Sequence, residues 1–244
     1  MTGRPLVFAH RGGSALAPEN TMRAFANGLS LGADGIELDV HLASDGTPVV
    51  IHDATVDRTT TGHGTVALMT AAELATLDVP TLAGVLRECR DTRVVIELKV
   101  NSKQLARAVV DVIREARAVE RVCVGSFGLR VVRAVRGLEP AIATSAAREE
   151  VRWALYQSWV RRMPAGVRYA GFQVPEMSGS TRLVSPRFIE LAHSAGLGVH
   201  VWTCNDEDDA RRLLSWGVDG LITDRPDVMV PLVQFAAGDR FRYP

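Results

Sequence analysis

The sequence has no excess of either charge, because its 28 lysines and arginines balance its 28 aspartates and glutamates. A chain without net charge exerts no general attraction on nucleic acid or on anionic lipid. We therefore expect no nucleic-acid partner. Any attraction for a negatively charged small molecule has to come from a local group of basic residues.

The sequence also lacks a long hydrophobic run. No apolar stretch approaches the roughly 20 residues that a membrane-spanning helix needs. Residues 1–5 lead directly into a short apolar segment, without the charged and apolar regions of a secretory leader. We expect a cytoplasmic protein with no membrane insertion.

Cysteine is scarce, with only Cys89, Cys123 and Cys204. They are odd in number, far apart and set among apolar neighbours. This pattern favours thiols packed in the core over a disulfide or a metal site.

Hydrophobic residues are abundant, at 47% of the chain, and β-branched runs alternate with segments of helical period. Eight such runs predict parallel strands, most of them followed by a helix. No linker divides them, so we predict an α/β fold in which residues 1–244 form a single (β/α)8 TIM barrel. The predicted strands are Leu6–His10, Gly35–Val40, Val94–Lys99, Val122–Ser126, Ala141–Thr144, Tyr169–Val174, Gly198–Trp202 and Gly220–Thr223.

One stretch departs from this alternation, at about residues 53–81. It follows the second strand and resumes a helical pattern only near Leu82. We interpret it as a short insertion over the carboxyl end of the barrel.

The second predicted strand and the residues after it carry the most information. Apolar residues alternate along the strand, so Glu37 and Asp39 share its other face. The dipeptide Asp45-Gly46 predicts a two-residue hairpin loop. That register would place His52 directly opposite Asp39, so that two carboxylates and an imidazole converge.

The third predicted strand ends with a second charged pair, Glu97 and Lys99, which face the same way. Charged residues inside a barrel are costly unless they are paired or bind a metal. One interpretation is a structural ion pair. The favoured one is a divalent cation held by Glu37, Asp39 and Glu97, with Lys99 free to contact phosphate. An all-oxygen donor set suits Mg²⁺ or Ca²⁺.

The first predicted strand ends in His10 and Arg11, followed by two glycines. An imidazole beside a guanidinium suits proton transfer on an anionic ligand. Functional residues of such barrels lie at the carboxyl ends of strands. The same rule makes Trp202, after the seventh strand, a wall of the pocket.

The remaining histidines are weaker candidates for the functional site. For His41 and His200 a packed, hydrogen-bonded side chain is the favoured interpretation. His63 and His193 read as surface residues of a loop and a helix.

Several motifs together resemble the glycerophosphodiester phosphodiesterase family. The resemblance runs from about residue 6 to 230, and residues 129–177 add little to it. The motifs are His10-Arg11-Gly12, Pro18-Glu19-Asn20-Thr21, residues 32–40, Asp45-Gly46 with His52-Asp53, Arg58-Thr59-Thr60, Glu97-Leu98-Lys99 and residues 217–226.

The resemblance implies hydrolysis of glycerophosphodiesters to sn-glycerol 3-phosphate and an alcohol. It also implies roles: one divalent cation on Glu37, Asp39 and Glu97; general base and acid for His10 and His52; phosphate binding for Arg11 and Lys99; and a glycerol contact for Trp202. The nucleophile is either the glycerol 2-hydroxyl of the substrate or a water molecule.

Two alternatives stay open at this point. One is a phospholipase D-type hydrolase acting on lysophospholipids, although the sequence shows no apolar surface for lipid. The other is a protein that binds glycerophosphodiesters without catalysis, which would be expected to have lost a histidine or a carboxylate.

Overall fold

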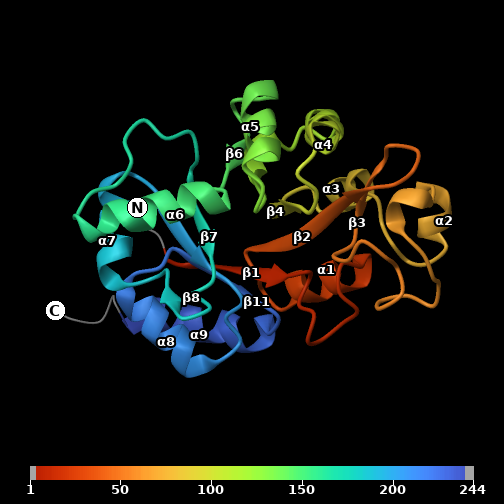
Figure 1. Cartoon of the computed structure of the whole chain (residues 1–244). Helices are drawn as coiled ribbons and strands as arrows, with labels where there is room; N and C mark the ends of the chain where they lie inside the picture. The colour runs from red at the N-terminus through yellow and green to blue at the C-terminus, as the bar shows by residue number, and fades with distance from the viewer. Residues whose placement is uncertain (1–3, 240–244) are drawn as a thin grey trace.

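Eight parallel strands form a barrel in the computed structural model, which describes residues 4–239 (Figure 1). The prediction of a (β/α)8 barrel is therefore confirmed. The strands, in their order around the barrel, are β6 (Ala143–Thr144), β5 (Val122–Gly125), β4 (Arg93–Leu98), β2 (Gly35–Leu42), β1 (Leu6–His10), β11 (Gly220–Thr223), β10 (Gly198–Val201) and β7 (Gly171–Val174).

The barrel closes where β6 meets β7. Ser145 and Gly171 form a parallel bridge there, and the Ala146 amide donates to the Gly171 carbonyl at 2.9 Å. A β-carbon on Gly171 would lie 2.4 Å from the carbonyl oxygen of Gly198 on the neighbouring strand. Only glycine allows the two backbones to approach so closely.

Helices surround the strands (Figure 1). Their inward faces carry the apolar residues that the helical period predicts, as in α4, where Leu105, Val109 and Ile113 are fully buried. The helices are α1 (Met22–Ser30), α3 (Leu82–Glu88), α4 (Lys103–Glu115), α5 (Leu129–Leu138), α6 (Arg148–Trp159), α7 (Pro186–Ser194), α8 (Glu207–Trp216) and α9 (Pro226–Asp239). No helix among residues 4–239 is both long and apolar enough to cross a bilayer.

The hairpin after β2 has a different register from the predicted one. Strand β3 (Pro48–Val50) pairs antiparallel with β2, and Val40 lies opposite Val50. The partner of Asp39 is therefore Ile51, whose amide donates to the Asp39 carbonyl at 3.0 Å, and not His52. The two-residue loop was wrong.

The turn chemistry explains the difference. The amide of Gly46 donates to the carbonyl of Ala43, and Gly46 has a φ of +83°. This is a three-residue loop, a tight turn followed by one left-handed glycine. The extra residue shifts every pair by one position.

The segment after the hairpin forms a small unit beside the barrel. It contains the 3-10 helix η1 (Val66–Leu68) and the helix α2 (Ala71–Ala75). Its apolar side chains pack with those of the hairpin in a cluster separate from the main core, formed by Ala43, Val49, Ile51, Val56, Val66, Leu74 and Val79. A second short hairpin, β8 (Met177–Ser178) and β9 (Thr181–Arg182), lies between β7 and α7.

The cysteines and His200 agree with the sequence predictions. Cys89 and Cys204 are buried, Cys123 is half-buried, and all three are free thiols. The ring of His200 packs against that of Phe8, with centroids 5.4 Å apart, and burial lowers its pKa. His200 is a neutral, packed side chain.

Candidate active site

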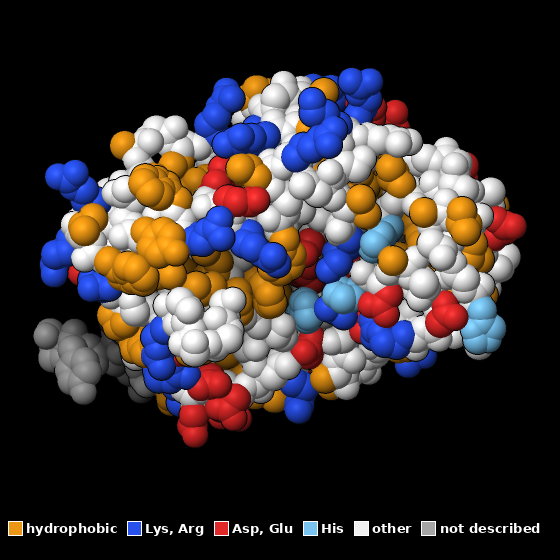
Figure 2. Space-filling model, in the orientation of Figure 1, with side chains coloured by type: hydrophobic (Ala, Val, Ile, Leu, Met, Phe, Trp, Pro, Cys, Tyr) orange, Lys and Arg blue, Asp and Glu red, His pale blue; other side chains and the backbone are white. Residues whose placement is uncertain are grey.

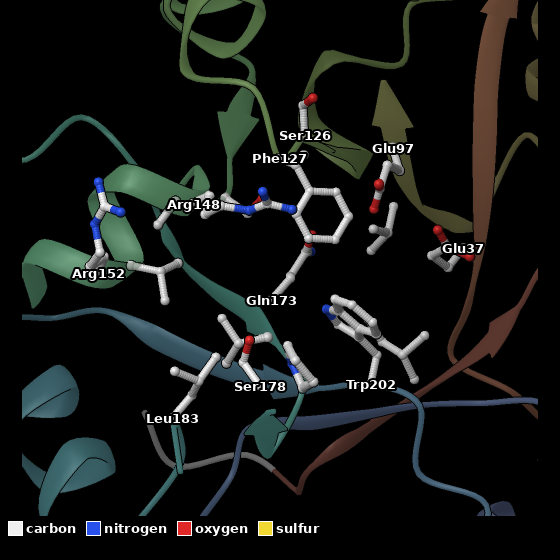
Figure 3. Close-up of a pocket in the computed structure, with 18 of the residues that line it drawn as sticks. Glu37, Glu97, Ser126, Phe127, Arg148, Arg152, Gln173, Ser178, Leu183 and Trp202 are labelled. Atoms are coloured by element: carbon white, nitrogen blue, oxygen red, sulfur yellow. The ribbon is translucent and has the colours of Figure 1, made fainter. Parts of the chain in front are cut away.

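A cavity of about 770 Å³ opens at the carboxyl ends of the strands (Figure 3). Its lining includes every residue that the sequence predicted for the site: His10, Arg11, Glu37, Asp39, His52, Glu97, Lys99 and Trp202. The close-up shows Glu37 and Glu97 on one side of the cavity and Arg148 and Arg152 on the other. Strands far apart in the sequence therefore bring the predicted residues together.

His10 ends β1, and a carboxylate orients its ring. Its Nδ1 lies 2.6 Å from Oδ1 of Asp224, and its Nε2 lies 3.8 Å from Oε2 of Glu37. Burial acts to lower the pKa of His10, but the hydrogen bond to Asp224 and the charge of Glu37 raise it above the ordinary value. His10 therefore holds its second proton more strongly than a free imidazole does.

Asp224 is held in turn by other side chains. The hydroxyl of Ser14 and the amide nitrogen of Asn205 both donate to its carboxylate, the latter at 2.7 Å. Burial opposes ionisation, yet these bonds and His10 lower the pKa of Asp224 to about 2. Asp224 is thus a permanent acceptor, which places the proton of neutral His10 on Nδ1 and leaves Nε2 facing the cavity.

His52 has the same arrangement with a different partner. Its Nδ1 lies 2.6 Å from Oδ1 of Asp53. His41 Nε2 is 3.1 Å from the carbonyl oxygen of His52, and burial lowers the pKa of His41. His41 thus donates as a neutral ring and holds the backbone of His52, in keeping with its predicted packed role.

The three carboxylates occupy neighbouring strands but have different surroundings. Burial and the charge of Asp39 raise the pKa of Glu37 to about 8, and burial raises that of Glu97. Burial also disfavours the charge on Asp39, but Lys99 and a 2.9 Å hydrogen bond from Asn20 lower its pKa below the ordinary value. The site therefore holds more carboxylates than its own basic residues can neutralise. The basic residues stabilise the charge of Asp39 the most.

Lys99 lies between two of these carboxylates. Its Nζ is 3.2 Å from Oδ1 of Asp39 and 3.5 Å from Oε1 of Glu97. The sequence placed Lys99 on the same face as Glu97, which is correct, but it expected a free ammonium group. Here the ammonium is paired, because the two carboxylates are the nearest compensating charges.

Arg11 belongs to a chain of charged side chains that runs across the mouth of the site. It contacts Asp39 at 3.3 Å and Glu19 at 3.0 Å. Glu19 also accepts from Arg58 at 2.7 Å, and Arg58 donates to Asp53 at 2.6 Å. The chain therefore connects the phosphate-binding candidate with the carboxylate that orients His52.

Gly12 allows Arg11 to take this position. The backbone turns through positive φ at both residues, +51° and +87°. A β-carbon on Gly12 would lie 2.6 Å from that of Ala24 in α1. The turn also points the Arg11 amide at Oε2 of Glu37, 3.2 Å away.

The geometry can be compared with known proteins. The model of the glycerophosphoryl diester phosphodiesterase family matches residues 10–228. The chain belongs to this family. The match covers both histidines, all three carboxylates and Asp224.

Three relatives from the same comparisons cover nearly the whole chain. A glycerophosphodiester phosphodiesterase of Caldanaerobacter subterraneus is 33% identical, over 95% of this chain and 98% of that protein. A crystal structure of glycerophosphodiester phosphodiesterase from Agrobacterium tumefaciens is 30% identical with a TM-score of 0.76, covering 91% and 98%. An Oleispira antarctica phosphodiesterase in complex with the product sn-glycerol-3-phosphate is 26% identical with a TM-score of 0.78, covering 95% and 97%.

The chain is an enzyme, because it belongs to this family. Several residues of its site were not predicted from the sequence. Five of them stand out in the sequence only as members of larger motifs: Asp224, Asp53, Asn20, Glu19 and Arg58. Their position inside those motifs was the available signal. Phe127, Arg148 and Arg152 carried none, because they belong to none of the motifs.

Proposed function

We propose that this family member hydrolyses glycerophosphodiesters, such as glycerophosphocholine or glycerophosphoethanolamine, to sn-glycerol 3-phosphate and an alcohol. The observation that carries the proposal is the pair of histidines, each with Nδ1 at 2.6 Å from a carboxylate, that line one cavity with Arg11 and Lys99. The product bound by the Oleispira antarctica relative supports the choice of substrate.

The two histidines would supply general base and general acid. In each neutral ring the carboxylate keeps the proton on Nδ1, so that Nε2 is the atom that exchanges protons with the substrate. One ring removes a proton from the nucleophile while the other protonates the departing alkoxide. Each such transfer contributes about 10² to 10⁴ in rate.

The basic residues would bind and polarise the phosphodiester. Charge accumulates on the nonbridging phosphate oxygens as the nucleophile attacks, and preorganised cations stabilise it. Arg11 is held in place by Glu19 and lies at the edge of the carboxylates. Lys99 follows β4, on the far side of β2 from β1, and like Arg11 it contacts the carboxylate of Asp39.

A divalent cation fits the carboxylates by chemistry and charge. Among residues 4–239 no group of three or more His, Cys, Asp or Glu side chains is yet arranged to hold a metal ion. However, Glu37 and Glu97 have raised pKa values because their buried charges are incompletely offset. Glu37, Asp39 and Glu97 would hold Mg²⁺ or Ca²⁺, which would offset phosphate charge.

A binding protein without catalysis is a weaker candidate, since both histidines and all three carboxylates are present and oriented. The expected cytoplasmic location stays a prediction.

The test is a hydrolysis assay over a panel of glycerophosphodiesters, with each divalent cation added separately after chelation. We expect sn-glycerol 3-phosphate to form and its rate to depend on the cation. A bound diester that survives intact with every cation would contradict the proposal.

A further inference from the structure

The catalytic cavity continues into a groove along helix α6. Its lining runs from His10 and Trp202 past Phe127 to Tyr156 and Trp159 near the end of the helix. The opposite wall comes from the β8–β9 hairpin and Leu183 (Figure 3). The groove is thus part of the site and not a separate pocket.

Helix α6 turns two different faces to its surroundings. Val151, Ala154 and Leu155 are buried and pack the helix onto the barrel. The groove face carries Arg148, Arg152, Tyr156 and Trp159, spaced by three or four residues as one stripe of a helix requires. The aromatic residues of this stripe are therefore not needed for the core.

These aromatics are exposed in a cluster. Tyr156 and Trp159 expose 49% and 56% of their surface, and Phe127 exposes 45%. Single exposed apolar residues are ordinary, but a contiguous patch marks a binding surface. In Figure 2 apolar side chains gather over α6 and continue toward the hollow where acidic and histidine side chains lie.

The groove changes in polarity along its length. Arg148 lies over the ring of Phe127 at 5.0 Å, and Phe127 contacts Trp202 edge to face at 6.0 Å. In the described part of the chain neither Arg148 nor Arg152 forms an ion pair, unlike Arg136, which binds Glu150 at 2.6 Å. Tyr156 and Trp159 form an edge-to-face pair farther along, with centroids 5.1 Å apart.

We infer that the groove binds the acyl chain of a lysophospholipid and that such monoacyl glycerophosphodiesters are substrates of the same site. The inference rests on the proposed function. The phosphodiester would lie at the histidines and carboxylates, the unpaired arginines would face the ester and phosphate oxygens, and the chain would lie against the aromatic residues. A small polar diester occupies only the first part of this path.

The reaction is a hydrolysis. Water supplies the oxygen that ends on phosphorus, the phosphorus–oxygen bond to the headgroup breaks, and a proton ends on the headgroup oxygen. The products are a monoacylglycerol phosphate and the free alcohol. No oxidant, reductant or further reactant is needed.

The test compares glycerophosphocholine with its hexanoyl and decanoyl lysophosphatidylcholine counterparts below their micelle concentrations, measuring choline release. Full burial of one methylene favours binding by about fourfold, and a groove open on one side should give about twofold. We therefore expect kcat/KM to rise roughly tenfold or more from the hexanoyl to the decanoyl substrate.

Two variants locate the effect. In Trp159→Ala, and separately in Tyr156→Ser, the decanoyl-to-hexanoyl ratio should fall to within about twofold. Leu68→Ala is the matched control, because Leu68 is 80% exposed and lies in the insertion, outside the cavity lining. It should leave the ratio unchanged.

The outcomes are distinguishable. Hydrolysis of glycerophosphocholine with none of the lysolipids would overturn the inference and leave the proposed function standing, whereas failure with all three would overturn both. A gain seen only on phosphatidylcholine vesicles carrying the lysolipid would show a membrane-docking surface instead of a chain-binding groove. A changed sedimentation coefficient of Trp159→Ala with an unchanged ratio would assign the aromatics to a contact between two copies.

Discussion

The Nδ1 atom of His10 lies 2.6 Å from Oδ1 of Asp224, although 214 positions separate the two residues. The pair forms because β1 and β11 are neighbours in the barrel. Asp224 keeps the pKa of His10 above its ordinary value against the effect of burial. The relationship therefore sets both the orientation and the basicity of one catalytic candidate.

The first prediction follows from this pair. Asp224→Asn should lower kcat by about 10- to 100-fold, as the loss of an orienting partner does. It should also shift the pH–rate limb of His10 toward lower pH, because the substitution removes the charge that raises its pKa. The pH profile of kcat/KM measures both effects. Asp57→Asn is the control, since Asp57 pairs with the exposed His63 at 3.2 Å; an unshifted limb in Asp224→Asn would contradict the assignment.

The second prediction concerns the histidines themselves. His10→Ala and His52→Ala should each lose about 10²- to 10⁴-fold in turnover, because each removes one proton transfer. Both should keep the far-ultraviolet circular dichroism spectrum of the parent. His63→Ala, which changes a side chain 85% exposed, should retain full activity. Near-parent activity in either cavity variant would exclude that histidine.

The third prediction uses the buried carboxylate at the centre of the site. Without a cation, burial and Asp39 raise the pKa of Glu37 from 4.5 to about 8. The folded state then binds a proton that the unfolded state has released, so the free energy of unfolding falls as the pH rises from 4.5 to 8.

Glu37→Gln should remove this dependence. In chelator at pH 8 the variant should be more stable than the parent by about 1–3 kcal/mol, and the difference should shrink toward pH 5. Thermal unfolding at several pH values measures it. The substitution should also abolish any activation by Mg²⁺ or Ca²⁺. Glu88→Gln is the control at a side chain 63% exposed, and it should change neither the pH dependence of stability nor the activation by cations. Equal stability of Glu37→Gln and the parent at pH 8 would contradict the raised pKa of Glu37.

The fourth prediction concerns Arg58, which joins Asp53 to Glu19. Arg58→Ala should lower kcat by about 10- to 100-fold with a smaller change in KM, because His52 and Arg11 lose their common support. Arg58→Lys should recover only part of kcat, since an ammonium group cannot bind both carboxylates as the guanidinium does. Steady-state kinetics separate the two constants. Arg87→Ala serves as control at a side chain 66% exposed, and a pure KM effect of Arg58→Ala would assign Arg58 to substrate binding.

Local patterns were sufficient for most of the fold. Strand β1 (Leu6–His10) and strand β11 (Gly220–Thr223) have the predicted bounds. Period and β-branched content are properties of adjacent residues, so they can be read without the tertiary structure. The hairpin register failed because a dipeptide does not distinguish a two-residue loop from a three-residue one.

The apolar groove along α6 is a second feature that local sequence patterns could not predict. Nothing in the sequence indicates this groove, since Phe127, Trp159 and Trp202 are scattered over 76 positions and come from different parts of the barrel. The barrel gathers them at one end, where β5, α6 and β10 terminate. A patch of this kind exists only after the strands have closed.

The sequence by itself determined the barrel and the eight predicted residues that line its cavity, because strand alternation, the carboxyl-end rule and the motifs depend on local order along the chain. Only the tertiary structure decided which groups complete the site. It paired His10 with Asp224, placed Lys99 between two carboxylates and extended the cavity along α6. The physical reason is that hydrogen bonds and charge act over a few ångströms in space, and no spacing along the sequence specifies those distances.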